Sequence, residues 1–120
     1  MPDLGPVSIA IRSSNLFTKK GNTMQNNQYT WDENKHKANI NKHKISFLEA
    51  VTVFDDPNAI TEYDEKHSHD EERFSIIGLS RNTRLLLVCH CYRNGDTLVR
   101  IISARKATKQ EYDRYREVNE

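Results

Sequence analysis

Two alternating apolar runs joined by a short polar turn constrain the fold more than any other feature of this sequence. RLLLVCHCY (residues 84–92) and TLVRIISA (residues 97–104) flank a turn built on the string NGD at residues 94–96. Asparagine and glycine accept the positive φ angles of the tight turns that join antiparallel strands. The pattern therefore predicts a β-hairpin.

Two further strand-like segments precede this hairpin. AITEYDE (residues 59–65) is short and has its acids on one side, and ERFSIIGLS (residues 72–80) ends at the turn RNT. The polar string EKHSHDEE (residues 65–72) reads as the loop between them. Since consecutive strands joined by turns usually pair, the four segments predict an antiparallel four-stranded meander.

A first helix is predicted to begin near Thr30 and to end near Lys44. Thr30 and Glu33 have the spacing of a capping box, and Asp32 is an alternative N-cap. Lysines and two histidines line one side of this helix. The residues expected to face inward are Ala38 and Ile40.

Two more helices complete the predicted fold. Ser46 and Glu49 have cap spacing at the start of SFLEAVTVF (residues 46–54), and Thr108 caps a last helix over about 109–117. The buried stripe expected in the second helix is Phe47, Ala50, Val51 and Phe54. The prediction is a small α+β domain with two N-terminal helices, an antiparallel four-stranded sheet and a C-terminal helix.

The chain of 120 residues is long enough for one modest core. Residues 1–28 include the polar string GNTMQNNQ and lack sustained periodicity, so we expect a loosely attached extension before a domain at residues 29–120. No apolar run approaches the roughly 18 residues of a membrane span, which favours a cytoplasmic protein. Cys89 and Cys91 are expected to be buried thiols.

Charge is arranged in blocks behind a net charge of only +1. Residues 35–44 hold four lysines and no acid, and residues 55–72 hold eight acids against one lysine. Residues 93–116 hold seven cations and three acids. Either these blocks are solvated faces, or a basic surface meets a polyanion while the acidic segment meets something basic.

The junction between the last strand and the last helix is a candidate phosphate site. Arg105 and Lys106 precede the N-terminus of the helix and Lys109 begins it, and backbone N–H groups at such an end bind phosphate. Strict alternation along the strand places Arg100 and Arg105 on opposite faces. We predict Arg105 as the phosphate ligand. The alternative is an ion pair between Arg105 and the acidic segment.

Arg73 follows a run of acids and begins an apolar strand. It either balances those acids or, if its strand lies beside the last one, converges with Arg105 on one phosphate. Two guanidinium groups at a phosphorus centre stabilise its developing negative charge.

The histidines supply candidates for proton transfer. His36 and His43 lie on the basic first helix. His67 and His69 lie in the acidic loop, where the pattern is only weak evidence for a metal. His90 lies inside a strand, where a hydrogen-bonded structural role is expected.

The sequence lacks the motifs of most cofactor enzymes, namely phosphate-binding glycine loops, zinc-ligand spacing and a nucleophile elbow, so we expect no cofactor. RNA suits such a site, because its own 2′-hydroxyl attacks the neighbouring phosphate. Tyr112 and Tyr115 could stack a base or donate a proton, or pack on the sheet, which we favour for Tyr115.

Three stretches resemble the BrnT family of bacterial type II toxins. They are WDENKHKANINKHKISFLEAVTVFDDP (residues 31–57), EERFSIIG (residues 71–78) and RIISARKATKQEYDRY (residues 100–115). The resemblance covers residues 29–117. It carries the family motifs at Trp31 and Asp32, at Asn39, Lys42 and His43, at Arg73, and at Arg105. Lys44 departs from the family, which has a glycine in this turn.

The resemblance implies a RelE-like ribonuclease toxin fold and a metal-independent endoribonuclease activity that halts translation. It also implies a BrnA antitoxin with a ribbon-helix-helix DNA-binding domain, so that operator DNA is bound only through the antitoxin.

The residues and the resemblance together predict that Arg105 and Arg73 hold the scissile phosphate, with Lys42 and His43 as a cation and a proton-transfer group. Residues expected to position RNA are Arg100, Lys106, Lys109, Tyr112 and Lys35. The alternative is a non-catalytic binding module or co-repressor.

Overall fold

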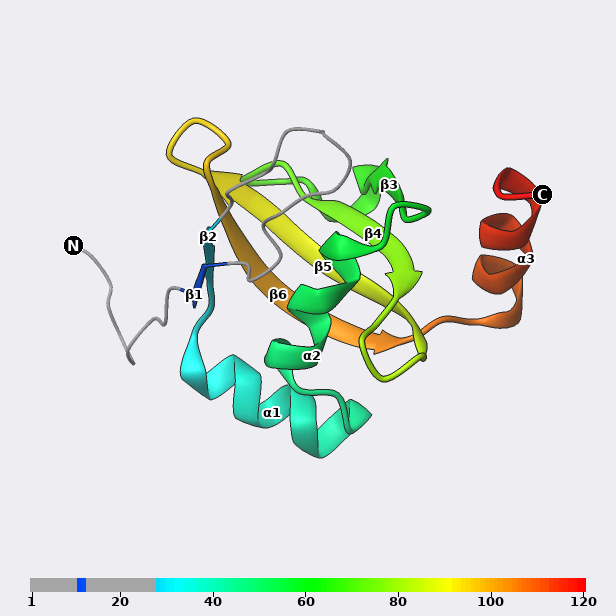
Figure 1. The fold of residues 1–120 in the computed structure, drawn as a ribbon. Helices are drawn as coiled ribbons and strands as arrows, with labels where there is room; N and C mark the ends of the chain where they lie inside the picture. Colours follow the sequence, from blue (N-terminus) through cyan, green and yellow to red (C-terminus); the bar gives the residue numbers. More distant parts are fainter. Residues whose placement is uncertain (1–10, 13–27) are drawn as a thin grey trace.

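The computed structural model describes residues 11–12 and 28–120, which form the predicted α+β domain around one sheet (Figure 1). The predicted extension, residues 1–28, lies outside the described residues except for Ile11–Arg12 and Gln28. No helix in the described part of the chain is long and apolar enough to cross a membrane. In chain order the elements are β1 (Ile11–Arg12), β2 (Gln28–Thr30), α1 (Glu33–His43), α2 (Phe47–Thr52), the 3-10 turn η1 (Val53–Asp55), β3 (Ile60–Tyr63), the 3-10 turn η2 (Glu65–His67), β4 (Phe74–Leu79), β5 (Leu85–Arg93), β6 (Leu98–Lys106) and α3 (Lys109–Val118).

The sheet has the strand order β1-β2-β6-β5-β4-β3. The predicted meander is confirmed, because β3, β4, β5 and β6 pair in sequence and antiparallel. The prediction that these four make up the whole sheet is wrong: β2 adds to β6 in parallel and β1 pairs with β2. A strand as short as β2 shows no periodicity, and the burial of Tyr29 within it is a tertiary effect.

Helix α1 begins one residue after Asp32, whose carboxylate accepts the backbone N–H of Asn34 at 2.9 Å. Asp32 is thus the N-cap, and Thr30 lies in β2 instead. The predicted inner face is wrong, since Ala38 is exposed and Ile40 is 40% exposed. The buried residue of α1 is instead the polar Asn39.

Helix α1 ends at Lys44, which has the left-handed backbone angles φ 63° and ψ 31°. The backbone N–H of Lys44 closes the helix by donating to the carbonyl oxygen of Ile40 at 2.9 Å. Glycine adopts this conformation without the steric cost of a side chain. Lys44, where the resemblance leads us to expect a glycine, thus has a backbone conformation that favours glycine.

Replacing Lys44 with glycine is expected to stabilise the protein by about 0.5–1 kcal/mol, because the left-handed strain is removed. Urea unfolding of Lys44→Gly measures this difference. The matched control is Lys37→Gly, which puts glycine inside α1 and is expected to destabilise by about 1 kcal/mol. A Lys44→Gly protein less stable than wild type would contradict the prediction that the left-handed conformation of Lys44 is strained.

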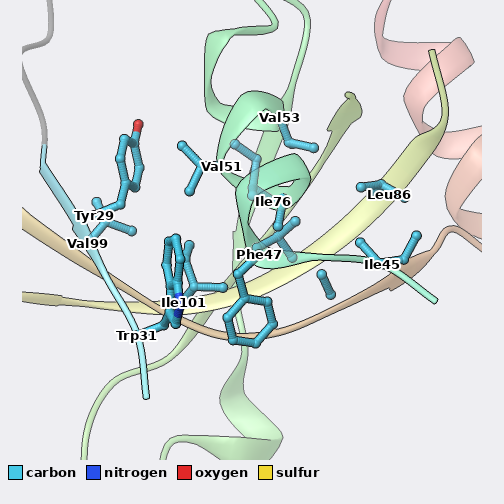
Figure 2. Close-up of a cluster of buried hydrophobic side chains, with 13 residues drawn as sticks. Tyr29, Trp31, Ile45, Phe47, Val51, Val53, Ile76, Leu86, Val99 and Ile101 are labelled. Atoms are coloured by element: carbon cyan, nitrogen blue, oxygen red, sulfur yellow. The ribbon is translucent and has the colours of Figure 1, made fainter. Parts of the chain in front are cut away.

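The core lies between the sheet and the two N-terminal helices (Figure 2). Ser46 caps α2 as predicted, its hydroxyl accepting the N–H of Glu49 at 3.0 Å. Trp31 and Phe47 are both buried and meet edge to face, with ring centroids 5.8 Å apart. Of the predicted stripe, Phe47, Ala50 and Val51 are buried and Phe54 is half-buried.

Glu49 joins α2 to the turn after β4. Its buried carboxylate accepts hydrogen bonds from the Ser80 hydroxyl at 2.6 Å and from Arg84 Nε at 3.0 Å, and it pairs with Arg84 Nη2. The bond from Arg84 lowers the pKa of Glu49. Glu49 therefore ties the helix layer to the sheet rather than completing a capping box.

Helix α3 begins with the predicted capping box. The Thr108 hydroxyl accepts the N–H of Glu111 at 3.2 Å, and Glu111 Oε1 accepts the N–H of Thr108 at 2.9 Å. Tyr115 is half-buried, and its hydroxyl donates to Asp56, which follows the η1 turn, at 2.7 Å. The end of β6 and the start of α3 are thereby held in a fixed relation.

Candidate active site

Strand β6 contains a β-bulge that changes which side chains share a face. Val99, Ile101 and Ala104 are all buried in the core under α1 and α2, although the spacing changes from two to three. The register shifts at this point: Ser103 pairs with Cys89 and Ile101 pairs with His90, which leaves Ile102 unpaired. An extra residue in one strand moves every later side chain to the other face.

The bulge corrects one prediction. Arg100 and Arg105 are five positions apart, which in a regular strand would put them on opposite faces. The extra residue, Ile102, brings both to the face that points away from α1 and α2. The prediction that they point in opposite directions is therefore wrong. The face away from α1 and α2 carries Arg73, Arg93, Arg100 and Arg105, and we call it the arginine face.

Nearby charged side chains affect the pKa values of two cysteine thiols on β5. Burial raises the pKa of Cys89, while the positive charges of Arg105 and Arg73 oppose that rise. Burial likewise raises the pKa of Cys91, which Arg93 and Arg100 oppose. Strand β5 lies between β4 and β6, so Arg73, which precedes β4, and Arg105 on β6 lie on either side of the strand that carries Cys89.

Arg105 is held by the first turn of α3. Its Nη1 and Nη2 donate to the two carboxylate oxygens of Glu111 at 2.9 and 3.0 Å, and Nη1 also donates to the carbonyl of Lys106 at 3.2 Å. These bonds raise the pKa of Arg105 and lower that of Glu111. The predicted alternative, a pair with the acidic segment, is not what forms. The hydrogen bonds to Glu111 and Lys106 use Nη1 and Nη2, and no hydrogen bond of Arg105 Nε occurs within the described chain.

A cavity of about 460 Å³ opens beside Arg105. Its floor is the sheet, one side is α3 and the other is the η2 segment. In Figure 1 the chain passes from the end of β6 through a short connection into α3. The lining residues from the sheet include Glu62, Ser75, Leu87, Cys89 and Arg105; α3 contributes Glu111 and Arg114; and η2 contributes Glu65, Lys66 and His67, preceded by Asp64.

Arg73 immediately precedes β4, and its carbonyl oxygen accepts the backbone N–H of Asp64 at 2.8 Å, although Arg73 itself does not line this cavity. Its Nη2 is 3.8 Å from a carboxylate oxygen of Glu71, which is a loose ion pair. Its Nε is buried and has no hydrogen-bond partner among the described residues. Leaving a buried donor without an acceptor is energetically costly.

Asn39 fixes the strand that carries Arg105. It is buried, and its side-chain amide donates to the carbonyl oxygens of Ile45 and Ala104, both at 2.9 Å. Its Oδ1 accepts the N–H of Ala104 at 3.1 Å. Asn39 therefore binds α1 to β6 at the residue before Arg105, and its motif position reflects structure rather than contact with substrate.

The other predicted site residues lie in two groups. Lys35, Lys42 and His43 are on α1, which packs on the helix side of the sheet, and no contact joins them to Arg105 or Arg73 within the described chain. Lys106 lies at the end of β6, where it pairs with Leu86, and Lys109 and Tyr112 lie on α3; none of the three lines the cavity. Tyr112 is 48% exposed, and Lys109 pairs with Asp113 at 3.2 Å.

Two histidines have structural roles. His36 stacks on Phe47 with centroids 5.0 Å apart, and its Nδ1 lies 3.3 Å from Glu33. His90 is fully buried, with Nδ1 3.2 Å from the carbonyl of Val88 and Nε2 3.2 Å from the hydroxyl of Tyr92. The hydrogen-bonded sheet role expected for His90 is confirmed.

The burial of His90 predicts a pH-dependent stability. Burial lowers the pKa of His90 from 6.5 to about 4, so below neutral pH the unfolded chain takes up a proton that the folded chain refuses. This group should cost about 2 kcal/mol of unfolding free energy between pH 7 and pH 5. Urea unfolding of wild type and His90→Gln at both pH values measures it. The variant should lose less stability on acidification, and an equal loss would contradict the prediction.

Sequence reasoning missed Arg114 and Asp64 as cavity residues and weighed His67 only as a weak metal ligand. Within the described chain, no group of three or more His, Cys, Asp and Glu side chains could hold a metal ion. The useful signal was the spacing of Asp64 and His67, which allows the carboxylate to cap the η2 turn and to contact the ring.

The part of the chain that carries the candidate site is similar to known proteins. The family model described as the ribonuclease toxin, BrnT, of a type II toxin-antitoxin system matches residues 31–111. Among solved structures, the ribonuclease toxin BrnT of Brucella abortus is similar, with 25% sequence identity and a TM-score of 0.50, over 66% of this chain and 94% of that chain. No curated protein sequence matches. The family match includes Arg73, Arg105 and Glu111 and ends before Arg114.

Proposed function

Because the chain belongs to the BrnT family of type II ribonuclease toxins, we propose that it is an endoribonuclease that cuts RNA without a metal ion and so inhibits translation and growth. The observation that carries this proposal is the position of Arg105. Its guanidinium is oriented by Glu111 at the edge of an open cavity, with one edge left to bind an anion.

Arg105 and Arg73 hold the scissile phosphate in this proposal. Both approach Cys89 on the arginine face, and Arg73 has a buried Nε without a partner in the described chain. Two guanidinium groups stabilise the charge that develops when a 2′-hydroxyl attacks the phosphorus atom. Arg100, Lys106, Lys109 and Tyr112 position the RNA on either side. The roles of Lys35, Lys42 and His43, which lie on α1, stay predictions.

The proposed partner is a BrnA-type antitoxin with a ribbon-helix-helix domain, and the complex would repress its own operon by binding operator DNA through the antitoxin. The acidic segment, residues 55–72, supports this proposal because it offers many carboxylates to a basic partner. The resemblance further supports a RelE-like fold for the toxin.

Cleavage of a defined RNA by the purified chain in EDTA, with and without the antitoxin, tests the proposal. Internal cuts made at substoichiometric protein, and lost on adding the antitoxin, are the expected result. A folded chain that binds its antitoxin, protects RNA stoichiometrically and makes no cuts, even with translating ribosomes, would instead indicate a non-catalytic binding module.

A further inference from the structure

His67 is held by a carboxylate at the rim of the cavity. Its Nδ1 lies 3.1 and 3.0 Å from the two carboxylate oxygens of Asp64, and its backbone N–H donates to Asp64 Oδ1 at 3.3 Å. The Asp64 side chain is 18% exposed, whereas that of His67 is 64% exposed. A largely buried carboxylate thus orients an accessible imidazole, as in acid–base sites generally. With Nδ1 bound, Nε2 is the nitrogen available to a substrate.

Two arginines line the same cavity as His67, and each is paired with a glutamate that also lines it. Arg105 on β6 is held by Glu111, and Arg114 on α3 is held by Glu62, with Nη2 2.8 Å and Nε 3.2 Å from its carboxylate. All of these side chains line the same cavity as His67 and Asp64. One cavity therefore combines phosphate-binding groups with a group that can transfer a proton.

We propose that His67 is the general base of the RNA cleavage reaction, that Asp64 positions it, and that Arg114 binds phosphate together with Arg105. This inference rests on the proposed ribonuclease function and adds its proton-transfer residue. Asp64 accepts a hydrogen bond from Nδ1–H of His67, and the lone pair on Nε2 is then free to accept a proton from the substrate.

Nε2 of His67 takes the proton of the ribose 2′-hydroxyl while the 2′-oxygen forms a bond to phosphorus. The bond from phosphorus to the 5′-oxygen breaks, its electron pair leaves with that oxygen, and the oxygen takes a proton from water. The products are a 2′,3′-cyclic phosphate and a 5′-hydroxyl. Arg105 and Arg114 stabilise the charge on the non-bridging oxygens.

The remaining histidines are less suitable. His90 is buried on the helix side of the sheet, and His36 is packed against Phe47. His43 lies on α1, which packs on the helix side of the sheet, and His69 is exposed beyond the cavity lining. His67 is the histidine that lines the cavity beside Arg105.

The test is to compare His67→Gln and Asp64→Asn with the control His69→Gln, a nearby exposed histidine. We expect His67→Gln to lower kcat for a short RNA by about 10²–10⁴-fold. Its affinity for the same RNA carrying a 2′-deoxy sugar at the cut site should stay within about threefold, because phosphate binding is left to the arginines. Asp64→Asn should also lower kcat more than it changes KM, and His69→Gln should behave as wild type.

A chemical rescue separates catalysis from structure. Added imidazole is expected to restore part of the cleavage by His67→Gly, which a purely structural role would not allow. If wild type cuts and His67→Gln cuts equally fast, or if His43→Gln instead abolishes cleavage with His67→Gln unaffected, this inference is overturned while the proposed function stands. If wild type cuts no RNA under any condition, both fall.

Discussion

Arg105→Ala is expected to lower RNA cleavage at least about a hundredfold and to abolish growth arrest. The variant loses the guanidinium that Glu111 holds at the cavity, and with it the main charge proposed for the transition state. The fold should survive, because the side chain is 38% exposed and leaves no core cavity. Antitoxin binding should also survive. Cleavage rate, growth and urea unfolding are measured in parallel.

Two further variants sharpen this test. Arg105→Lys keeps the charge but loses the two-point contact with Glu111, so an intermediate rate is expected. Arg116→Ala removes an exposed arginine from α3 that contacts Tyr112 and Glu120, and should leave cleavage unchanged. A soluble, folded Arg105→Ala protein that still arrests growth would rule out the role assigned to Arg105.

Asn39→Ala is expected to destabilise the protein by about 3 kcal/mol, which is roughly 10 °C in Tm for a domain of this size. The substitution leaves the carbonyl groups of Ile45 and Ala104 and the N–H of Ala104 without their buried partner. Unsatisfied buried groups of this kind are costly. Urea and thermal unfolding measure the loss.

Asn41→Ala is the matched control, because Asn41 is an exposed asparagine on the same helix. It should change stability by less than about 0.5 kcal/mol. A loss below about 1 kcal/mol for Asn39→Ala would mean that water replaces the lost contacts and that α1 does not depend on them. If Asn39→Ala remains folded but cleaves RNA more slowly than wild type, the hydrogen bonds between Asn39 and Ala104 also help to position Arg105.

Local sequence patterns predicted most of the secondary structure. The hairpin of β5 and β6, the cap of α2 by Ser46 and the capping box of Thr108 and Glu111 all depend on neighbouring residues, and all are confirmed. The start of α1 was correct only in its alternative form, at Asp32. These features follow from turn and capping preferences that act within a few residues.

The candidate site was predicted only in part. Arg105 was singled out from its position at the end of a strand and before a helix, and the structure places it beside a cavity. The relation of Arg100 to Arg105 was wrong, because the bulge at Ile102 depends on pairing with β5. Asp64 and His67 line the same cavity, which the sequence did not predict because it depends on how η2 packs against the sheet.

The sequence by itself determined the helices, the meander, the family and the arginine at the strand end, because these are set by local periodicity, caps and motifs. Only the tertiary structure decided the addition of β2, the inward turn of Asn39, the common face of the arginines and the pairing of Arg105 with Glu111. The first three depend on residues far apart in the chain or on a register shift, whereas Arg105 and Glu111 are six residues apart and their pairing depends on how α3 is oriented at the end of β6. Their energies arise from burial and pairing that no short stretch of sequence contains.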